Sequence, residues 1–393
     1  MAVLIPVEEA QARLMALGAP LGVERPPIAA AAGRWTAEPV IARRDQPAVD
    51  LSAMDGYAVR HADLPGPLRV IGQSAAGNGF SGAVGHGEAV RIFTGAPVPE
   101  GADTVVIQED CARDGDVLRV MEPPQPGRNI RRRGNDFAAG QVLLGAGMRL
   151  TPQRLGAAIM AGHGDIAVYR RPRVAVISTG DELVPPGVEP TRHQIPSSNG
   201  PMIAAMLTTE GALADDFGII GDRKDDIYQA IERARDHDVI LTIGGASVGD
   251  LDLVKPALDD AGAQLDFIKA ALKPGKPLMA GTLGKAVVIG LPGNPVSAFV
   301  TAFLFAVPLV RRMMGAAEPL PATLPAITGC DLPAGGARTE FLRARIGGGM
   351  VWPLDNQDSA ALAALARADV LIRRDAHAAP APAGTAVPVL AVG

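Results

Sequence analysis

The chain has 393 residues, 48% of them hydrophobic and 20% charged, with a formal net charge of −5. This length is enough for about two to four domains with packed cores. The acidic balance excludes the overall basic surface that suits nucleic acid or an anionic membrane. An anionic ligand must therefore be held by locally placed cations and backbone amides.

The two cysteines and the first residues bear on cellular location. Cys111 and Cys330 are far apart in sequence, so they predict neither a disulfide framework nor a metal site. Two thiols in a reducing compartment are the simplest interpretation. No basic stretch followed by a long apolar run is found near the N-terminus, so we expect no secretory signal and a cytoplasmic protein.

The N-terminal part of the chain predicts two domains. A helix is expected over residues 6–17, with glutamates in its first turn and Gly18 after its end. A second helix is expected to begin at Thr151-Pro152 and end near residue 161. Between these helices, residues 45–135 are rich in Gly, Pro and short β-like runs, at 68–73, 89–93, 104–109 and 117–120. We expect an inserted β-rich domain (45–135) within a discontinuous helical linking domain (1–44 and 136–172).

From residue 173 onwards, strands alternate with helices. Strands are expected at 174–178, 213–219, 239–243, 264–268 and 286–289. Helices are expected at 199–210, 224–236, 253–260 and after Asn294. This alternation predicts a three-layer α/β/α domain (173–315) with a mostly parallel sheet. The uncharged stretch 286–310 is interrupted by Leu-Pro-Gly-Asn-Pro, so we expect no membrane span.

The last part of the chain, 316–393, is rich in Pro, Ala and Gly. Short strands are expected at 341–346, 370–372 and 387–392, which predicts a C-terminal β domain. The whole chain is therefore expected to be a multi-domain α/β protein with β-rich modules around a central α/β domain.

Polar loops follow three of the predicted parallel strands directly. In such sheets ligands bind beyond the carboxyl ends of the strands, so three loops of this kind indicate one crevice. Glycine lets backbone N–H groups approach an anion closely, and proline fixes the loop. The candidate residues for binding a phosphate-bearing ligand are Thr179, Gly180, Gly244, Gly245, Ser247, Gly249, Pro292, Gly293, Asn294, Pro295 and Ser297.

Carboxylates and lysines near these loops predict a cation and an oxyanion site. Asp250 and Asp252 follow the Gly-rich loop, where a phosphate would repel them unless a divalent cation lay between, and with Glu182 they are candidate Mg²⁺ ligands. Lys273 and Lys276 lie in a Lys-Pro-Gly-Lys-Pro loop that two prolines hold rigid. Ammonium groups so placed suit an oxyanion.

Other strings are open to more than one interpretation. The Met-Asp-Gly-Tyr-Ala string at 54–58 is a plausible β-turn with Asp-Gly at its centre. Residues 126–136 contain four arginines, which is typical of a solvated or nucleic-acid-binding run. The acidic net charge and the lack of interleaved aromatic residues argue against nucleic acid. The chain offers no credible nucleophilic triad.

Taken together, these strings resemble the molybdopterin molybdenumtransferase family, the MoeA type that is also the E domain of gephyrin. The resemblance covers essentially the whole chain. Each string is weak alone, whereas their order and spacing are specific. The strings are 54–58, 94–96, 131–136, 178–183, 198–200, 244–252, 273–277, 291–297, 338–341 and 357–359.

The resemblance implies an activity and a set of site residues. Members of this family insert molybdenum from molybdate into the dithiolene of adenylylated molybdopterin, release AMP, and need Mg²⁺ or a similar cation. By resemblance, Ser247 and Asp252 lie in the pterin-nucleotide loop, and Lys273 and Lys276 face anionic groups. Polar residues expected at or near the cleft are Asp55, Thr94, Asp136, Glu182, Ser198, Asn199 and Asp225. Candidates for holding molybdate are Ser297, Arg338 and Ser359.

The resemblance also implies four domains and a homodimer in which parts of both subunits surround each site. Transient contacts with other molybdenum-cofactor enzymes are expected, and no nucleic acid or membrane partner. Two other functions remain open. One is a scaffold that keeps the fold without the chemistry, against which Asp252, Lys273 and Lys276 argue. The other is an enzyme that adenylylates molybdopterin, whose own domain resembles 173–315; the two β-rich domains favour the insertase.

Overall fold

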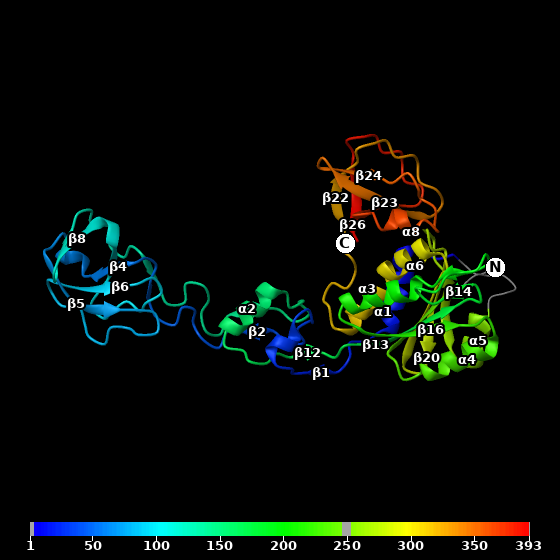
Figure 1. The fold of residues 1–393 in the computed structure, drawn as a ribbon, viewed down its shortest axis with the longest axis horizontal. Helices are drawn as coiled ribbons and strands as arrows, with labels where there is room; N and C mark the ends of the chain where they lie inside the picture. The colour runs from blue at the N-terminus through cyan, green and yellow to red at the C-terminus, as the bar shows by residue number, and fades with distance from the viewer. Residues whose placement is uncertain (1–3, 246–252, 393) are drawn as a thin grey trace.

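The computed structural model describes residues 4–245 and 253–392. Figure 1 shows an elongated chain: a β module (strands β4–β9) at one end, then a linking domain, then an α/β body with a C-terminal domain beside it. This confirms the expected fold class of a central α/β domain with β-rich additions.

The α/β body is built on a six-stranded sheet with the order β16-β13-β17-β21-β20-β18. Its strands are β13 (Arg173–Thr179), β16 (Leu213–Ile220), β17 (Val239–Ile243), β18 (Gln264–Lys269), β20 (Pro277–Leu283) and β21 (Ala286–Leu291). The first four in spatial order are parallel, and β20 is antiparallel to both of its neighbours.

Strand β20 was not among the predicted strands, because Pro277 and Gly281 are poor strand formers. Gly281 has a specific role there. A Cβ at this position would lie 2.3 Å from the Gln264 carbonyl oxygen of β18, so only glycine lets the two backbones pair so closely.

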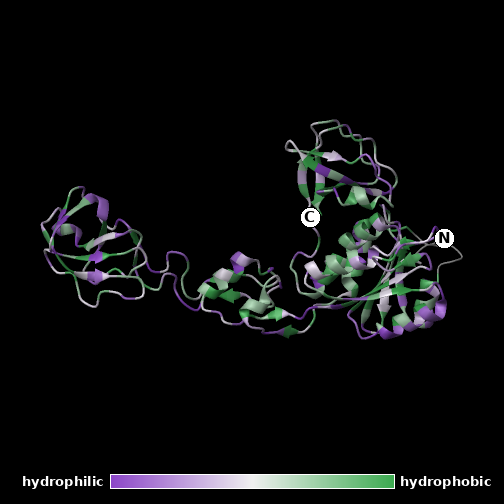
Figure 2. Cartoon of the chain, in the orientation of Figure 1, coloured by the Kyte–Doolittle hydropathy of each residue, from purple (hydrophilic) through white to green (hydrophobic). Residues whose placement is uncertain are grey.

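Helices cover both faces of this sheet, as the sequence predicts. Alternate residues of β13 point to opposite cores: Val174 and Val176 to one, Ala175 and Ile177 to the other. The first core is covered by α1 (Val7–Leu17), α3 (Asn199–Thr209), α6 (Pro295–Thr301) and α7 (Val307–Met313). The second is covered by α4 (Lys224–Arg233) and α5 (Val254–Asp260). Figure 2 shows hydrophilic residues concentrated on α4.

Helix α1 belongs by packing to the α/β body. Its buried residues Val7, Ala10 and Leu14 lie in the same core as Val174 and Leu309. Residues 1–44 were expected to belong to the linking domain. The helix instead buries its apolar stripe against the body, because the linking domain has only a small core of its own.

The helical run Pro295–Met313 has a mean hydropathy of 1.6 over an 18-residue window, and 78% of that window is buried in the body. It comprises α6, a π-helical turn (Ala302–Ala306) and α7. By length and composition it could cross a membrane, but its apolar residues form the core beneath the sheet. A strand, a loop and a buried helix thus account for the uncharged stretch.

The β module contains a six-stranded sheet with the order β7-β4-β6-β5-β9-β8. Its strands are β4 (Gly56–Val59), β5 (Leu68–Ser74), β6 (Glu88–Ile92), β7 (Thr104–Ile107), β8 (Cys111–Asp114) and β9 (Val117–Val120). Strand β4 is fully buried and corrects the β-turn interpretation of 54–58. The chain bends at 53–55, and Gly56 then begins the strand. A Cβ on Gly56 would lie 1.9 Å from the Val106 oxygen, so β7 can pair here only against glycine.

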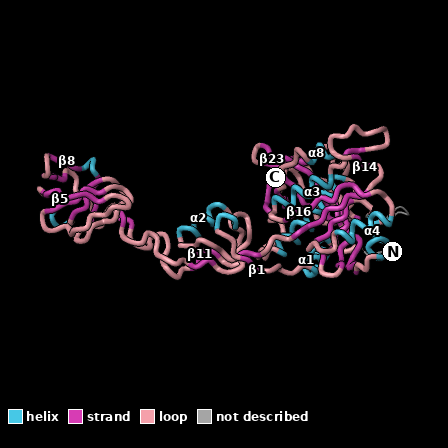
Figure 3. The backbone as a smooth tube through the Cα atoms, turned by 60° about the horizontal axis from the view of Figure 1, so that its bottom comes forward, coloured by secondary structure: helices cyan, strands magenta, loops and turns pink. Residues whose placement is uncertain are grey.

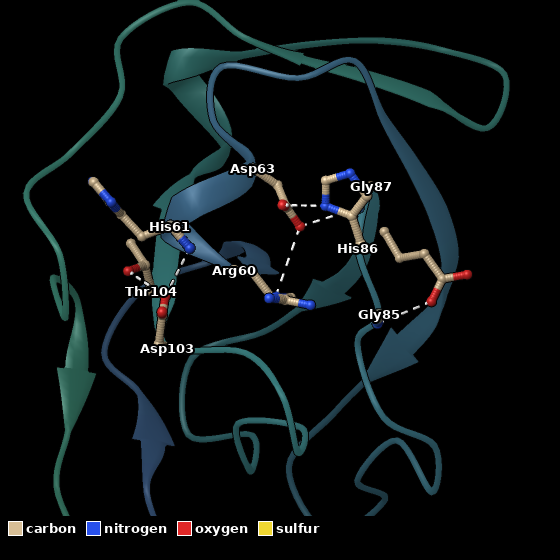
Figure 4. Close-up of polar contacts among 9 residues, drawn as sticks. Arg60, His61, Asp63, Gly85, His86, Gly87, Asp103 and Thr104 are labelled. Carbon is tan, nitrogen blue, oxygen red and sulfur yellow. Dashed lines mark hydrogen bonds and ion pairs between the residues drawn. The ribbon is translucent and has the colours of Figure 1, made fainter.

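A polar cluster ties together the loops at one side of this module (Figure 4). Asp63, whose side chain is 4% exposed, accepts hydrogen bonds from His86 Nδ1 at 2.6 Å and from the Gly87 N–H at 3.1 Å. Arg60 lies 3.9 Å away. Burial opposes ionisation of Asp63, but the Gly87 N–H and the His86 ring outweigh it and hold its pKa below the usual value.

Two chain segments that lie side by side join the β module to the linking domain (Figures 1 and 3). In this neck, β3 (Leu51–Ser52) pairs with β10 (Ile130–Arg131). Arg132 forms an ion pair with Asp50 at 2.6 Å, and Arg133 one with Asp45 at 2.5 Å. Two arginines of the arginine-rich run thus stabilise the neck.

The linking domain has few regular elements. It comprises β1 (Val23–Glu24), β2 (Val40–Ile41), β11 (Val142–Leu144), β12 (Val168–Tyr169), a short 3-10 helix (Ile28–Ala31) and α2 (Pro152–Met160). Thr151 caps α2, as expected, by accepting a hydrogen bond from the Arg154 N–H.

The C-terminal domain shares its sheet with the body. Its own elements are β22 (Leu324–Ile327), β23 (Thr339–Gly347), β24 (Met350–Pro353), α8 (Leu362–Leu365), β25 (Val370–Arg374) and β26 (Ala386–Ala391). Strand β19 (Leu272–Lys273), which comes from the body, adds to the edge of β23, with Leu272 opposite Thr339 and Lys273 opposite Glu340. The lysine loop is therefore attached to both parts.

Candidate functional site

Three loops meet at the carboxyl edge of the parallel sheet, beyond β13, β17 and β21. The Gly244 N–H donates to the Leu291 oxygen at 3.2 Å, and Thr179 Oγ1 donates to the Ile243 oxygen at 3.4 Å. The predicted strand-end residues Thr179, Gly244 and Gly293 therefore lie together, because their strands are parallel neighbours.

Glycine is required where these loops touch. Gly244 has φ +96°, and a Cβ there would lie 2.6 Å from the Thr179 oxygen. Gly245 has φ +59°, and its Cβ would lie 2.5 Å from Val254 Cγ2 at the start of α5. Both conformations suit glycine alone. The next predicted residues of this loop, Ser247, Gly249, Asp250 and Asp252, lie outside the described residues.

The loop after β13 brings an exposed carboxylate to this edge. Glu182 folds back towards Gly180, where a Cβ would lie 2.4 Å from Glu182 Oε2. Asp181 and Asp222 clamp this loop to the end of β16, each carboxylate accepting the other residue's N–H, at 3.0 and 3.3 Å. Among residues 4–245 and 253–392, no group of three or more His, Cys, Asp or Glu could hold a metal.

Two helices begin at the same edge. Asn199, at the start of α3, donates from Nδ2 to the Gly293 oxygen at 2.6 Å, which joins α3 to the loop after β21. Ser198 precedes it, 3.5 Å from the Asn199 amide oxygen. Asp225 is exposed in the first turn of α4, the helix that follows β16.

The lysine loop packs against α6. Gly275 has φ +112°, and its Cβ would lie 2.5 Å from Thr301 Cγ2, so the loop can approach the helix only with glycine there. Both lysine side chains are exposed. Lys273 Nζ lies 3.1 Å from Glu340 Oε1, and Arg338 donates to the Leu272 oxygen at 3.3 Å.

A loop of the C-terminal domain completes the arrangement. Ser359 accepts at Oγ a hydrogen bond from Asn294 Nδ2 at 3.0 Å, and its carbonyl oxygen accepts one from the Val296 N–H at 3.0 Å. Pro292 and Pro295 flank this contact, and Ser297 lies one turn further along α6, 4% exposed. Residues from body and C-terminal domain thus meet at the start of α6.

The predicted site residues of the β module and the neck lie away from the sheet edge that carries the other predicted site residues. Asp55 and Thr94 are in the module, at the far end of the molecule from the body in Figure 1. Asp136 is exposed in the neck. Asp55 accepts hydrogen bonds from the Thr94 N–H at 2.7 Å and Thr94 Oγ1 at 2.8 Å, and these hold the pKa of Asp55 below its usual value.

Two residues near the lysine loop had no assigned role from the sequence. Glu340 pairs with Lys273, and Arg343 supports the loop that carries Ser359. The Arg-Thr-Glu-Phe string at 338–341 was a signal for Glu340. Arg343 gave none, because its role depends on contacts with a loop more than ten residues away.

Comparisons with known proteins agree along the whole chain. Family models match at residues 5–162 (MoeA N-terminal region, domain I and II), 175–312 (probable molybdopterin binding domain) and 325–392 (MoeA C-terminal region, domain IV). A molybdopterin molybdenumtransferase of Haemophilus influenzae is 38% identical over 317 residues, 79% of this chain and 78% of the relative. One from Staphylococcus aureus is 32% identical over 383 residues, 94% and 91% of the two chains.

Solved structures give the same result. The chain is similar to the molybdopterin biosynthesis MoeA protein of Pyrococcus horikoshii OT3, with a TM-score of 0.84 and 27% identity over 99% of this chain and 100% of that one. A second MoeA structure from Pyrococcus has a TM-score of 0.80 and 30% identity over 99% of both. The chain therefore belongs to the molybdopterin molybdenumtransferase family and is an enzyme of molybdenum cofactor biosynthesis.

Proposed function

We propose that the enzyme inserts molybdenum from molybdate into adenylylated molybdopterin and releases AMP in a Mg²⁺-dependent reaction. The observation that supports this most is the meeting of three strand-end loops, the lysine loop and Ser359 at one edge of the sheet. Anion-binding backbone, ammonium groups and a hydroxyl are then within reach of one elongated, anionic substrate and a second oxyanion.

The strand-end loops are proposed to hold the phosphates and pterin. Gly245 has no side chain to cover its backbone N–H, which is proposed to contact a phosphate, whereas the Gly244 N–H already donates to the Leu291 oxygen. The proposed binding residues are Thr179, Gly180, Ser198, Asn199, Gly244, Gly245, Ser247, Gly249, Pro292, Gly293, Asn294 and Pro295.

Molybdate is proposed to bind where the lysine loop meets the C-terminal domain. Lys276 is exposed and forms no ion pair within the described parts of the chain, whereas Lys273 is already 3.1 Å from Glu340. We therefore assign the main oxyanion contact to Lys276. Lys273, Arg338, Ser297 and Ser359 complete the pocket.

Glu182, with Asp250 and Asp252, is proposed to hold Mg²⁺ beside the phosphates. Glu182 is exposed at the edge where the phosphates are proposed to lie, and Mg²⁺ usually takes one or two protein carboxylates together with phosphate oxygens and water. This donor set therefore fits the ion. The chemistry that Mg²⁺ supplies when bound is neutralisation of phosphate charge.

The reaction balances without a redox partner. Two Mo–O bonds of molybdate are replaced by bonds to the two dithiolene sulfurs, and the displaced oxides leave as water with the thiol protons and two from solvent. One water breaks the phosphoanhydride and frees AMP. Asp55, Asp136 and Asp225 are proposed to act near the cleft, and the lysines to lower the barrier by positioning and charge stabilisation.

A homodimer in the cytoplasm is part of the proposal. The β module carries Asp55 and Thr94, and the long neck holds them away from the body of their own chain. A second copy could bring its module to this edge. Transient contacts with other molybdenum-cofactor enzymes would then transfer the product.

The experiment is an assay of purified protein with adenylylated molybdopterin, molybdate and Mg²⁺. AMP release that depends on both molybdate and Mg²⁺ is expected. A scaffold would release none, and an adenylylating enzyme would instead consume ATP and molybdopterin. Asp252→Ala should weaken the Mg²⁺ dependence far more than it lowers thermal stability. An unchanged Mg²⁺ titration in that variant would contradict the metal assignment.

A further inference from the structure

Arg343 is a buried cation whose partners are backbone oxygens. It lies in β23 and is 1% exposed. Its Nη2 donates to the Asn356 oxygen at 3.2 Å and to the Asp358 oxygen at 3.1 Å. Its Nε has no hydrogen-bond partner among the described residues. Burial lowers the pKa of this guanidinium, although nearby Asp358 partly offsets the effect.

Gln357 holds the same loop from its other side. Its Oε1 accepts from the Arg343 N–H at 3.0 Å, and its Nε2 donates to the Arg343 and Leu354 oxygens, both at 2.8 Å. Four of these bonds connect Arg343 in β23 to residues 356–358, and the Leu354 N–H adds a fifth by donating to the Arg343 oxygen at 2.8 Å. This fixes the backbone up to the residue before Ser359.

Stability alone gives no reason for an arginine here. A buried charge that lacks an ionic partner is costly, and apolar replacements of buried ionic groups are often neutral or stabilising. What an apolar side chain cannot do is hold two carbonyl oxygens, Asn356 and Asp358, in one orientation. The planar guanidinium offers donors in a fixed geometry suited to that task.

We propose that Arg343 is a positioning residue for the molybdate pocket: it fixes residues 356–358 so that Ser359 faces the start of α6. The proposal rests on the proposed function for its effect on molybdate. Ser359 contacts Asn294 and Val296 directly, so a loop that loses its support moves the Ser359 hydroxyl relative to α6. The expected result is weaker molybdate binding with the chemical step preserved.

Arg374 provides a matched control. It is 8% exposed in β25 of the same domain, and it also donates to two backbone oxygens, those of Pro333 and Ala379. Among the described residues, no hydrogen bond joins Pro333 or Ala379 to α6. Arg343→Lys and Arg374→Lys each keep the charge and remove the planar fork.

The experiment measures molybdate dependence and amide exchange in both variants of the full chain. Arg343→Lys should raise the half-maximal molybdate concentration about tenfold, with the maximal rate within about threefold of the parent. Amide exchange should become faster at residues 356–361 and at Val296. Arg374→Lys should alter exchange near residues 333 and 379 and leave molybdate dependence within about twofold. If Arg343→Lys does not fold, Gln357→Glu tests the same loop, and the same changes are expected.

The proposal is wrong if the two arginine variants shift molybdate dependence equally, or if exchange at 356–361 does not change in Arg343→Lys. A parent that shows no molybdate-dependent AMP release contradicts the proposed function instead. The exchange measurement still decides in that case. Faster exchange confined to 356–361 and Val296 supports Arg343 as the positioning residue, and unchanged exchange overturns it.

Discussion

The α/β body and the β module contribute to the candidate site in opposite ways. In the body, the loops after β13, β17 and β21 and the loop of Ser359 are joined inside one chain by direct hydrogen bonds, and the lysine loop packs on α6 beside them. In the module, Asp55 and Thr94 form a pair of their own, at the end of a long neck (Figure 1).

If Asp55 and Thr94 belong to the proposed site, one chain brings together only part of it. The body has its polar residues at the carboxyl ends of parallel strands, where a ligand is expected from the fold alone. The module offers no such edge, since its sheet is mostly antiparallel and its core is small. Under the proposed function, Asp55 and Thr94 act only when the body of a second copy faces them.

The largest expected effect comes from mixing two inactive variants. Asp55→Ala damages the module and Lys276→Ala the body, so each alone should lose most AMP release at the molybdate concentration that half-saturates the parent. After subunit exchange, about half of the dimers are mixed and each mixed dimer keeps one intact site of two, which restores about a quarter of parental activity. Light scattering should give a mass near twice 40.5 kDa.

No recovered activity after verified subunit exchange would mean that both regions act within one chain. The comparison between module and body would then need another explanation, such as a bend of the neck. A stable monomer at micromolar concentration would contradict the shared site directly.

The second effect sharpens the role of the lysine loop. Lys276→Ala should raise the molybdate concentration for half-maximal rate roughly tenfold to a hundredfold, because a charge-assisted hydrogen bond contributes about 1.5–3 kcal/mol. Lys273→Ala should have the smaller effect, since Lys273 is shared with Glu340. Lys285→Ala, in the turn between β20 and β21 at the opposite edge, is the control and should match the parent.

The third effect tests whether the β module unfolds independently of the α/β body. Gly56→Ala places a methyl group 1.9 Å from the Val106 oxygen, so β4 and β7 must move apart. A loss of about 3 kcal/mol is expected in the module alone. Calorimetry should then show an early transition for the module while the body unfolds as in the parent. A uniform shift of one transition would mean that module and body unfold as a unit.

The smallest effect concerns acid stability of the module. The folded-state pKa of Asp63 is lowered, so its stabilising contribution is present above the unfolded value of about 3.9 and is lost as the pH falls through the folded value. Asp63→Asn should destabilise the module at pH 7 and make less difference in strong acid. Denaturant melts from pH 7 to pH 2 measure this. A difference between variant and parent that is constant over that range would contradict the role of the ionised carboxylate.

Sequence reasoning was most successful where the chain alternates strand and helix. An apolar run such as 174–177 is typical of a buried parallel strand. Neighbouring parallel strands end at the same edge of the sheet, so the loops that follow them lie together. The proximity of Thr179, Gly244 and Gly293 could therefore be predicted. It failed where tertiary contact decides. Asp-Gly is typical of a turn, so Gly56 was interpreted as part of one. Glycine is required there because the backbone of β7, about fifty residues later, passes too close for a side chain.

Contacts between segments far apart in the sequence could not be predicted from local sequence patterns either. Helix α1 reads as a short amphipathic helix, and nothing in its own residues says that it packs on the body. Arg343 reads as one more strand residue, since its carbonyl partners lie thirteen and fifteen residues away. Lys273 is recognisable as a cation, whereas its pairing with Glu340 follows only from the register of β19 on β23.

That register has a consequence for how the polypeptide can be divided. Without β19, the first residues of β23, Thr339 and Glu340, would present unpaired N–H and C=O groups along an open sheet edge, and open edges recruit strands from other molecules. A fragment of residues 316–393, cut where the composition changes, would therefore tend to aggregate. The same fragment with residues 270–277 linked to it would keep β19 as a strand that covers the open edge.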